Sequence, residues 1–193
     1  MGKLDSLGFD LEVWRHRELL TESNQLPMYS KHRKKPRKYQ LKAIEDGLHS
    51  LRNNGRALIE MATGLGKTIV MAEVMERLLK AEPELRILVL AHSKAIVSQV
   101  ERAIWSQLPK TVMTHILSGS EKPIMDEGVT VATFQSLISD YENNVEIPDF
   151  DLIMVDECHH AQADSFSNIL NFVSRDAMMM GVTATPWRGD QRD

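Results

Sequence analysis

The sequence predicts an α/β domain with a mostly parallel β-sheet and helices on both of its faces. Short apolar runs of strand length alternate along the chain with segments whose apolar residues recur at helical spacing. Such alternation favours strand–helix–strand units and therefore parallel strands. A glycine-rich turn joins one of these strands to the next helix at residues 64–68. The chain has 193 residues, which is enough to bury a full hydrophobic core.

Six segments are expected to form strands. Residues 57–60, 87–90 and 152–155 are short apolar runs, which are typical of strands buried on both faces. Residues 112–117 alternate between apolar and polar side chains, which also indicates a strand. The remaining two expected strands are residues 129–133 and 178–182.

Five segments that follow residue 40 carry apolar residues at helical spacing. The first is expected to end near Asn53-Asn54-Gly55, the second at Pro83 and the third at Pro109, because glycine and proline terminate helices. The expected helices are residues 41–51, 69–79, 96–108, 134–141 and 166–173.

Residues 1–36 are expected to form an N-terminal helical extension and a basic connector, and residues 37–193 the α/β domain. Leu4 to Leu20 carries apolar side chains, Trp14 among them, in a pattern that predicts a helix packed on the domain behind it. Six of the eight residues from Lys31 to Lys38 are lysine or arginine. This run is interpreted either as a solvated connector or as a patch that contacts a phosphate backbone.

Composition limits the classes of function. A net charge of -4 argues against a protein that coats nucleic acid through bulk positive charge, so nucleic-acid contact would need a local patch. The single cysteine, Cys158, excludes a disulfide framework and suits a reducing compartment. The N-terminus lacks the pattern of a signal peptide, and no apolar run approaches the roughly 20 residues that span a bilayer. A cytoplasmic protein without membrane contact is expected.

The glycine-rich turn predicts a phosphate-binding loop. Gly64-Leu65-Gly66-Lys67-Thr68 lies between a strand and a helix, where glycines let several backbone N–H groups point inward and the helix N-terminus adds partial positive charge. Lys67 is expected to reach the β and γ phosphates, and the Thr68 hydroxyl to bind Mg²⁺. The strict motif has glycine where this chain has Met61.

Asp156-Glu157 is expected to form the second half of a nucleotide site. The pair follows a buried strand, so Asp156 can bind Mg²⁺ opposite Thr68 while Glu157 orients and deprotonates the attacking water. Polar residues follow the other expected strands in the same way, and ligands bind at this edge of a parallel sheet. They are His92 and Ser93 after one strand, and Thr183 and Thr185 at the end of another.

Cys158-His159-His160 invites a zinc interpretation, which the chain does not favour. Structural zinc sites normally use four ligands from two separated pairs, and no second pair of suitable spacing is present. A histidine that lies beside the γ-phosphate and senses nucleotide state is the preferred hypothesis.

The motifs together resemble the first lobe of superfamily-two DExH helicases and translocases. The residue sequences D-E-C-H-H-A and G-V-T-A-T-P-W-R are most similar to those of the branch that contains restriction-enzyme motor subunits and DNA-repair helicases. The resemblance spans residues 37 to 188 and implies a three-layer, RecA-like P-loop NTPase fold. The matching segments are Arg37 to Gln40 (adenine recognition), Met61 to Thr68 (motif I), Val89 to Ser93 with Gln99 (motif Ia), Gly119 (motif Ib), Thr133 to Leu137 (motif Ic), Asp156 to His159 (motif II) and Thr183 to Pro186 (motif III).

The resemblance implies a role for each matching residue. Gln40 would pair with N6 and N7 of adenine and favour ATP, and an upstream aromatic residue such as Tyr29 could stack on the base. Thr183 and Thr185 would couple the nucleotide side to the nucleic-acid side. The implied nucleotide-site residues are Arg37, Gln40, Thr63, Gly64, Leu65, Gly66, Lys67, Thr68 and His159, with Lys67, Asp156 and Glu157 catalytic and Thr68 and Asp156 on Mg²⁺. The implied contacts to nucleic-acid phosphates and sugars are His92, Ser93, Gly119, Thr133, Gln135 and Ser136, for which ordinary loop capping is the alternative.

The family's second lobe, with its catalytic arginines, has no counterpart in this sequence. An arginine against the γ-phosphate is worth roughly 10³ to 10⁵ in turnover, so this chain alone is expected to bind Mg·ATP and hydrolyse it poorly. The expected partners are a second RecA-like lobe, nucleic acid (DNA preferred over RNA) and subunits of a restriction or repair complex. The alternatives are a non-motor P-loop phosphotransferase, which leaves Gln40 and Gln135 unexplained, and a non-catalytic nucleic-acid-binding lobe.

Overall fold

The computed structural model describes residues 28–117, 127–143, 145, 147–157 and 176–184. Within them, six strands form one sheet in which every neighbouring pair is parallel, which confirms the predicted α/β class. The helices of this part of the chain are α3 (Lys38–Asn54), α4 (Lys67–Ala81), α5 (Lys94–Gln107) and α6 (Phe134–Glu142). In spatial order the strands are β1 (Arg56–Glu60), β6 (Met178–Thr183), β5 (Leu152–Asp156), β2 (Arg86–Ala91), β4 (Gly128–Thr133) and β3 (Thr114–Leu117).

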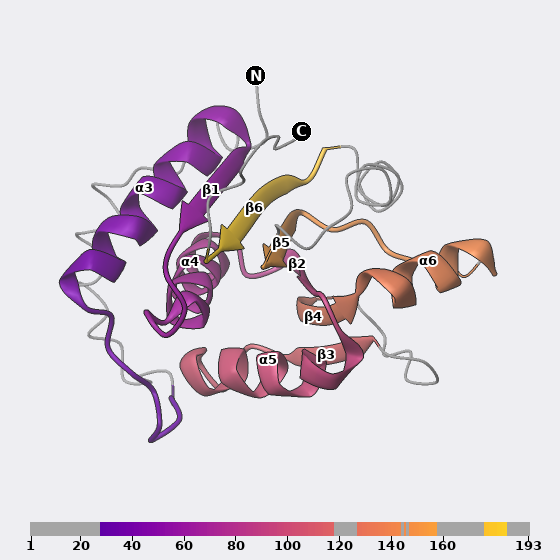
Figure 1. Cartoon of the computed structure of the whole chain (residues 1–193), viewed down its shortest axis with the longest axis horizontal. Helices are drawn as coiled ribbons and strands as arrows, with labels where there is room; N and C mark the ends of the chain where they lie inside the picture. Colours follow the sequence, from indigo (N-terminus) through magenta and orange to yellow (C-terminus); the bar gives the residue numbers. More distant parts are fainter. Residues whose placement is uncertain (1–27, 118–126, 144, 146, 158–175, 185–193) are drawn as a thin grey trace, which may run out of the picture.

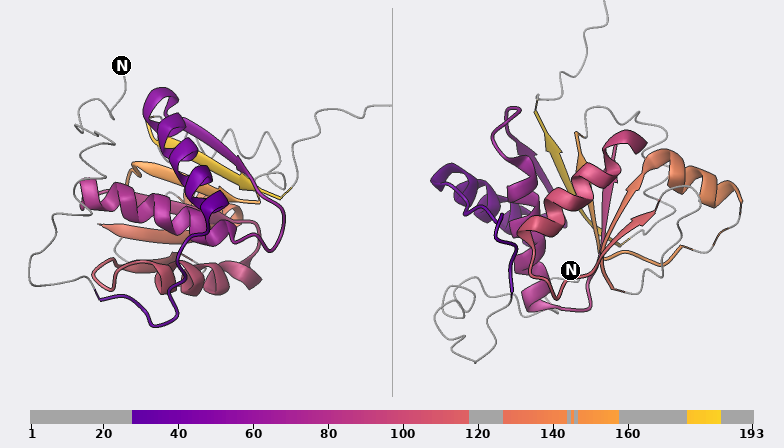
Figure 2. Two further views of the ribbon diagram at one scale, coloured as in Figure 1. Left: turned by 90° about the vertical axis from the view of Figure 1, so that its left-hand side faces the viewer. Right: turned by 90° about the horizontal axis from the view of Figure 1, so that it is seen from below.

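The helices cover both faces of the sheet, so the predicted three layers are present (Figure 1). α3, α4 and α5 pack on one face, and α6 packs on the other. Figure 2 shows the same arrangement from two further directions, with the strands fanned by the twist of the sheet.

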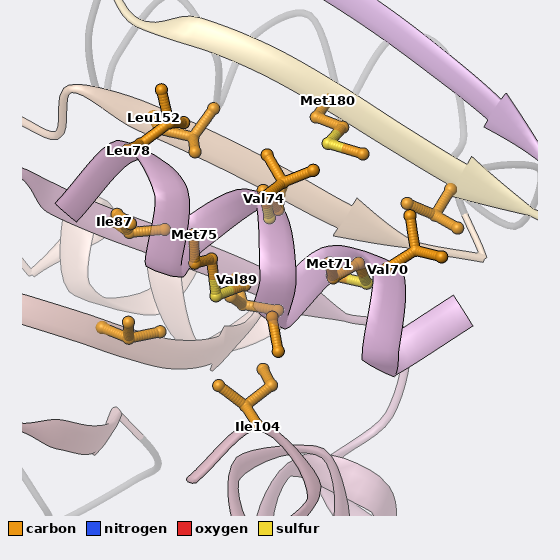
Figure 3. Packing of buried hydrophobic residues seen from close by; sticks show 14 of the residues in the cluster. Val70, Met71, Val74, Met75, Leu78, Ile87, Val89, Ile104, Leu152 and Met180 are labelled. Atoms are coloured by element: carbon orange, nitrogen blue, oxygen red, sulfur yellow. The ribbon is translucent and has the colours of Figure 1, made fainter. Parts of the chain in front are cut away.

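The larger core lies between α4 and the sheet (Figure 3). Successive turns of α4 place apolar side chains against β2, β5 and β6, and each of these side chains is at most 1% exposed. Complete burial of one such side chain stabilises the fold by about 1.5–3 kcal/mol, so α4 and the loop that precedes it are held firmly. The α4 residues concerned are Val70, Met71, Val74, Met75 and Leu78.

The observed elements follow the predicted ones within a few residues, with one informative difference. The strand expected from residue 112 begins at Thr114. The reason is a turn in which the Val112 N–H donates to the Pro109 carbonyl at 3.0 Å, so Val112 is not available to the sheet. α3 ends as expected at Gly55, whose φ of 67° is accessible to glycine at little cost. The helices expected at 4–20 and 166–173 lie outside the described residues.

The basic connector is only partly solvated. Arg33 binds two carboxylates of α4, Glu73 at 2.9 Å and Glu76 at 2.8 Å, whereas Lys31, Lys34 and the other lysines of the run are exposed. The proposed domain boundary at residue 37 lies one residue before α3 and stays a prediction. No helix in the described ranges is long and apolar enough to cross a membrane.

Candidate nucleotide-binding site

The loop between β1 and α4 has the backbone conformation that its glycines predict. Gly64 and Gly66 have φ values of 82° and 84°, in the left-handed region that other residues rarely adopt. The Leu65 N–H donates to the Ala62 carbonyl at 3.2 Å, and the Gly66 carbonyl accepts from the Ile69 N–H at 3.0 Å. The loop therefore turns directly into the first turn of α4, whose N-terminus is a suitable place for phosphate.

Met61 shows why this loop does not need glycine at its first position. Its side chain is 7% exposed and belongs to the core, and its N–H donates to the carbonyl of Thr183 on β6 at 2.9 Å. Among the described non-glycine residues only Glu157 has a positive φ, so Met61 adopts an ordinary backbone conformation. The departure from the strict motif thus costs the loop no strain.

Gln40 supports the phosphate loop from α3. Its amide nitrogen donates to the Leu65 carbonyl at 2.7 Å, and its amide oxygen accepts from the Arg37 N–H at 2.7 Å. The Tyr39 hydroxyl also donates to the Leu65 carbonyl, at 3.1 Å. Gln40 is 2% exposed, so the visible role of this amide is to fix the loop, and its pairing with adenine stays a prediction. The role of Tyr39 was missed by sequence reasoning, although it lies within the Arg37 to Gln40 motif.

The carboxyl ends of three neighbouring strands converge on Glu157. Lys67, after the β1 loop, places its ammonium 2.5 Å from Glu157 Oε1, and both side chains are largely buried. The N–H of Ala184, directly after β6, donates to Glu157 Oε2 at 3.3 Å. Glu157 itself follows β5 with a φ of 52°, a strained conformation for a non-glycine residue that is typical of functional sites. The structure thus brings together residues 90 apart in the sequence.

Asp156 lies in the same group of charges. Burial raises the pKa of its carboxyl, and so does the neighbouring Glu157 carboxylate, while Lys67 and His92 act in the opposite direction. These effects place Asp156, Glu157 and Lys67 within electrostatic range of one another. His92, expected among the nucleic-acid contacts, is exposed and lies near enough to influence Asp156.

The residues that would hold a metal are oxygen donors. Thr68 follows Lys67 in the first turn of α4, and Asp156 precedes Glu157 at the end of β5. A hydroxyl and a carboxylate fit Mg²⁺, which takes one or two protein ligands and completes its shell with phosphate and water. Within the described ranges no group of three or more His, Cys, Asp or Glu side chains could hold a metal by itself.

The expected nucleic-acid contacts divide into buried and exposed side chains. The Thr133 hydroxyl accepts from the Ser136 N–H at 3.1 Å and lies 3.0 Å from the Ser136 hydroxyl, and both residues are buried. The Ser93 hydroxyl caps α5 by accepting from Ala95 N–H at 3.2 Å. The Thr133 and Ser93 hydroxyls therefore cap α6 and α5, Ser136 lies within α6, and His92 and Gln135 are exposed. The contacts of these five residues to nucleic acid stay predictions.

Tyr29 is bonded to α4 through its hydroxyl, and its stacking on the base stays a prediction. Its hydroxyl donates to Glu76 at 2.5 Å, nine residues along α4 from Lys67 and so about 13 Å from the loop along the helix axis. Thr183 is 2% exposed at the end of β6. The expectations for Gly119, Cys158-His159-His160 and Thr185 fall outside the described residues.

The fold and the site together define an ATP-binding lobe of the helicase class. The chain belongs to the family described as "Type III restriction enzyme, res subunit", which matches residues 33–188. It is 35% identical over 162 residues to the Escherichia coli type I restriction enzyme EcoAI endonuclease subunit, covering 79% of this chain and 20% of that subunit.

Solved structures of similar fold include a restriction-modification enzyme and a helicase. The ATP-dependent type ISP restriction-modification enzyme LlaBIII bound to DNA has a TM-score of 0.64 and 25% identity, covering 81% of this chain and 13% of that one. The UvsW helicase of bacteriophage T4 has a TM-score of 0.69 and 22% identity, covering 95% and 63%, and shows the fold alone. These similarities do not favour a phosphotransferase. The chain spans about a fifth of the E. coli subunit.

Proposed function

We propose that this lobe binds Mg·ATP in the notch between the β1 loop and the ends of β5 and β6. Joined to a second RecA-like lobe, it would couple ATP hydrolysis to movement along DNA. The observation that carries the proposal is the contact between Lys67 and Glu157, which brings the phosphate-binding ammonium and the candidate base to one edge of the sheet.

The observed ion pair suggests the order of events in the site. The Lys67 ammonium donates to Glu157 when no nucleotide is bound, and in this proposal it turns towards the β and γ phosphates when the nucleotide binds. Glu157 would accept a proton from the attacking water, while the Ala184 N–H orients its second oxygen. Thr68 and Asp156 would hold Mg²⁺, which would offset the negative charge that develops on the phosphates.

DNA as the partner rests on two relatives of this chain. The E. coli relative is a restriction endonuclease subunit, and LlaBIII is a restriction-modification enzyme bound to DNA. His92 and Gln135, which are exposed after β2 and on α6, are the candidate contacts to one strand's backbone. Contacts to phosphate and sugar position a motor without reading sequence, which suits movement along DNA.

The test is ATP hydrolysis with and without duplex DNA, single-stranded DNA and RNA. It is made on this chain and on a chain that carries a second lobe. We expect slow hydrolysis by this chain and DNA-stimulated hydrolysis by the longer one. The reason is that an arginine of the second lobe, placed against the γ-phosphate, raises kcat by a factor of roughly 10³ to 10⁵. Fast DNA-stimulated hydrolysis by this chain alone would contradict the need for a second lobe. Transfer of phosphate to a metabolite in place of water would favour a phosphotransferase.

A further inference from the structure

A groove of about 330 Å³ lies at the amino-terminal edge of the sheet, opposite the edge that carries Lys67 and Glu157. Its walls come from segments that precede strands. Pro83 and Pro109 follow α4 and α5, Met113 precedes β3, and Gly128 is the first residue of β4. The volume is within the roughly 300–1,000 Å³ of typical ligand sites.

The groove is mainly apolar. Five of its ten lining residues have apolar side chains, namely Leu79, Pro83, Pro109, Val112 and Met113. The charged residues on the α4 wall, Glu76 and Lys80, are paired with each other at 2.7 Å. The third charged lining residue, Glu127, precedes β4 and is exposed. The paired charges of the α4 wall suit an apolar occupant rather than an ion.

Exposed apolar side chains gather around this groove. Met113, which lines it, is 48% exposed, Met28 is 75% exposed and Trp105 is 43% exposed. Met28 lies beside the groove because its carbonyl accepts from the N–H of Lys110, the residue after Pro109, at 2.8 Å. The Lys110 ammonium in turn lies over the Trp105 ring. These are three of the seven large apolar side chains that are exposed in the described residues, and such a cluster marks a binding surface.

We propose that residues 4–20 of the same chain dock their apolar side chains in this groove. The chain is held at the groove at Met28, and Figure 2 shows the segment that follows running beside α5 towards α3. The Lys34 N–H bond to Gln107 at 2.9 Å fixes the same segment a second time. Leu20 precedes Met28 by eight residues, a reach of up to about 28 Å, and Leu7, Leu11 and Trp14 follow the same apolar pattern.

Attachment to the same chain favours this occupant over a separate partner. A tether of a few residues gives the segment a local concentration in the millimolar range, so a weak apolar contact is enough to keep it docked. The groove and the nucleotide notch lie at opposite edges of the sheet, so the inference is independent of the proposed function.

The test uses the full chain with the photoreactive residue p-benzoylphenylalanine at position 113. The matched control carries it at Leu58, which is 65% exposed on the edge strand β1 and lies away from the groove. After irradiation, we expect the position-113 protein to run at monomer mass with its cross-link in residues 4–20. Circular dichroism melting verifies that both proteins are folded.

A second substitution tests the chemistry of the contact. Trp14→Glu should lower the cross-link yield from position 113 about tenfold, whereas Ser6→Glu, on the polar side of the expected helix, should leave it unchanged. A covalent dimer, a cross-link elsewhere in the chain, no cross-link, or an equal yield from position 58 would each overturn the proposal. Loss of ATP binding in these proteins would bear on the nucleotide notch and not on this groove.

Discussion

Replacing Lys67 by methionine should expose how strongly the nucleotide-free site depends on its ion pair. The ammonium of Lys67 is 2.5 Å from Glu157, and the side chains are 11% and 20% exposed. Methionine has a similar length but cannot donate, so Glu157 would lie beside Asp156 without its ammonium partner. Exposed pairs contribute about 0–1 kcal/mol, and breaking a fully buried pair costs about 3–5 kcal/mol. Because the Lys67–Glu157 pair is largely buried, we expect Lys67→Met to lower the free energy of unfolding by about 2 kcal/mol.

The assay is urea unfolding of four proteins without nucleotide: wild type, Lys67→Met, Glu157→Gln and the double variant. Lys67→Met leaves the Glu157 carboxylate without its ammonium partner, and Glu157→Gln removes that carboxylate. The double variant should therefore regain about 1 kcal/mol of the free energy of unfolding that Lys67→Met loses. The coupling energy should then be about 1–2 kcal/mol. Lys42→Met is the matched control, since Lys42 is 77% exposed and its pair with Asp46 should be worth under about 0.5 kcal/mol.

Two further measurements sharpen this prediction. The pKa of Asp156 is already raised, and loss of Lys67 removes one of the charges that oppose the shift. A carboxyl with a raised pKa loses folded-state stability as the pH rises, so the defect of Lys67→Met should grow from acidic to neutral pH. Mg·ATP at 100 times its Kd should stabilise the wild type by about 2.7 kcal/mol and Lys67→Met not at all. If the losses of unfolding free energy in Lys67→Met and Glu157→Gln add up to the loss in the double variant within about 0.5 kcal/mol, the ion pair is refuted.

Three other substitutions test the parts that surround the site. Arg33→Met removes a guanidinium that binds two largely buried carboxylates of α4. The free energy of unfolding should fall by about 2 kcal/mol and the melting temperature by about 4–8 °C. An unchanged melting temperature would show that the connector is solvated. Burial and the bond to a carboxylate raise the pKa of Tyr29 from 10.0 to about 12, so stability should fall as the pH rises from about 10 to about 12, and Tyr29→Phe should remove the last phase of an absorbance titration. Gly66→Ala adds a Cβ 2.5 Å from the Gln40 amide nitrogen at a backbone φ of 84°. This substitution should lower the free energy of unfolding by about 2 kcal/mol and remove most of the affinity for ATP. The control Gly55→Ala has a φ of 67° but nothing within 4 Å, and should cost only the backbone strain of about 1 kcal/mol.

The local patterns predicted the elements well because each depends on near neighbours. Buried strands such as β2 are apolar throughout, and α4 repeats its apolar residues at the helical period. The start of β3 was displaced because a single main-chain bond from Val112 to Pro109 removed two residues from the strand. Apolar periodicity does not report such a turn.

Residue type was a weaker guide to role than to structure. Thr133 and Ser136 have side chains that suit a phosphate backbone, yet both are buried and bonded to each other. Tyr29 has a ring that suits adenine, yet its hydroxyl is held by Glu76 on α4. A short hydroxyl or an aromatic ring serves packing and binding equally well, so residue type alone does not assign the role.

The sequence by itself determined the α/β class, the phosphate loop and the acidic pair after a buried strand. Each of these features depends on the types and spacing of residues that are close together in the chain. Only the tertiary structure decided the strand order β1-β6-β5, which lets Lys67, Ala184 and Glu157 meet from three strand ends. It also decided that Arg33 of the connector binds α4. Contacts between residues tens of positions apart depend on which strands pair, and pairing is set by the packing of the whole sheet rather than by any local run.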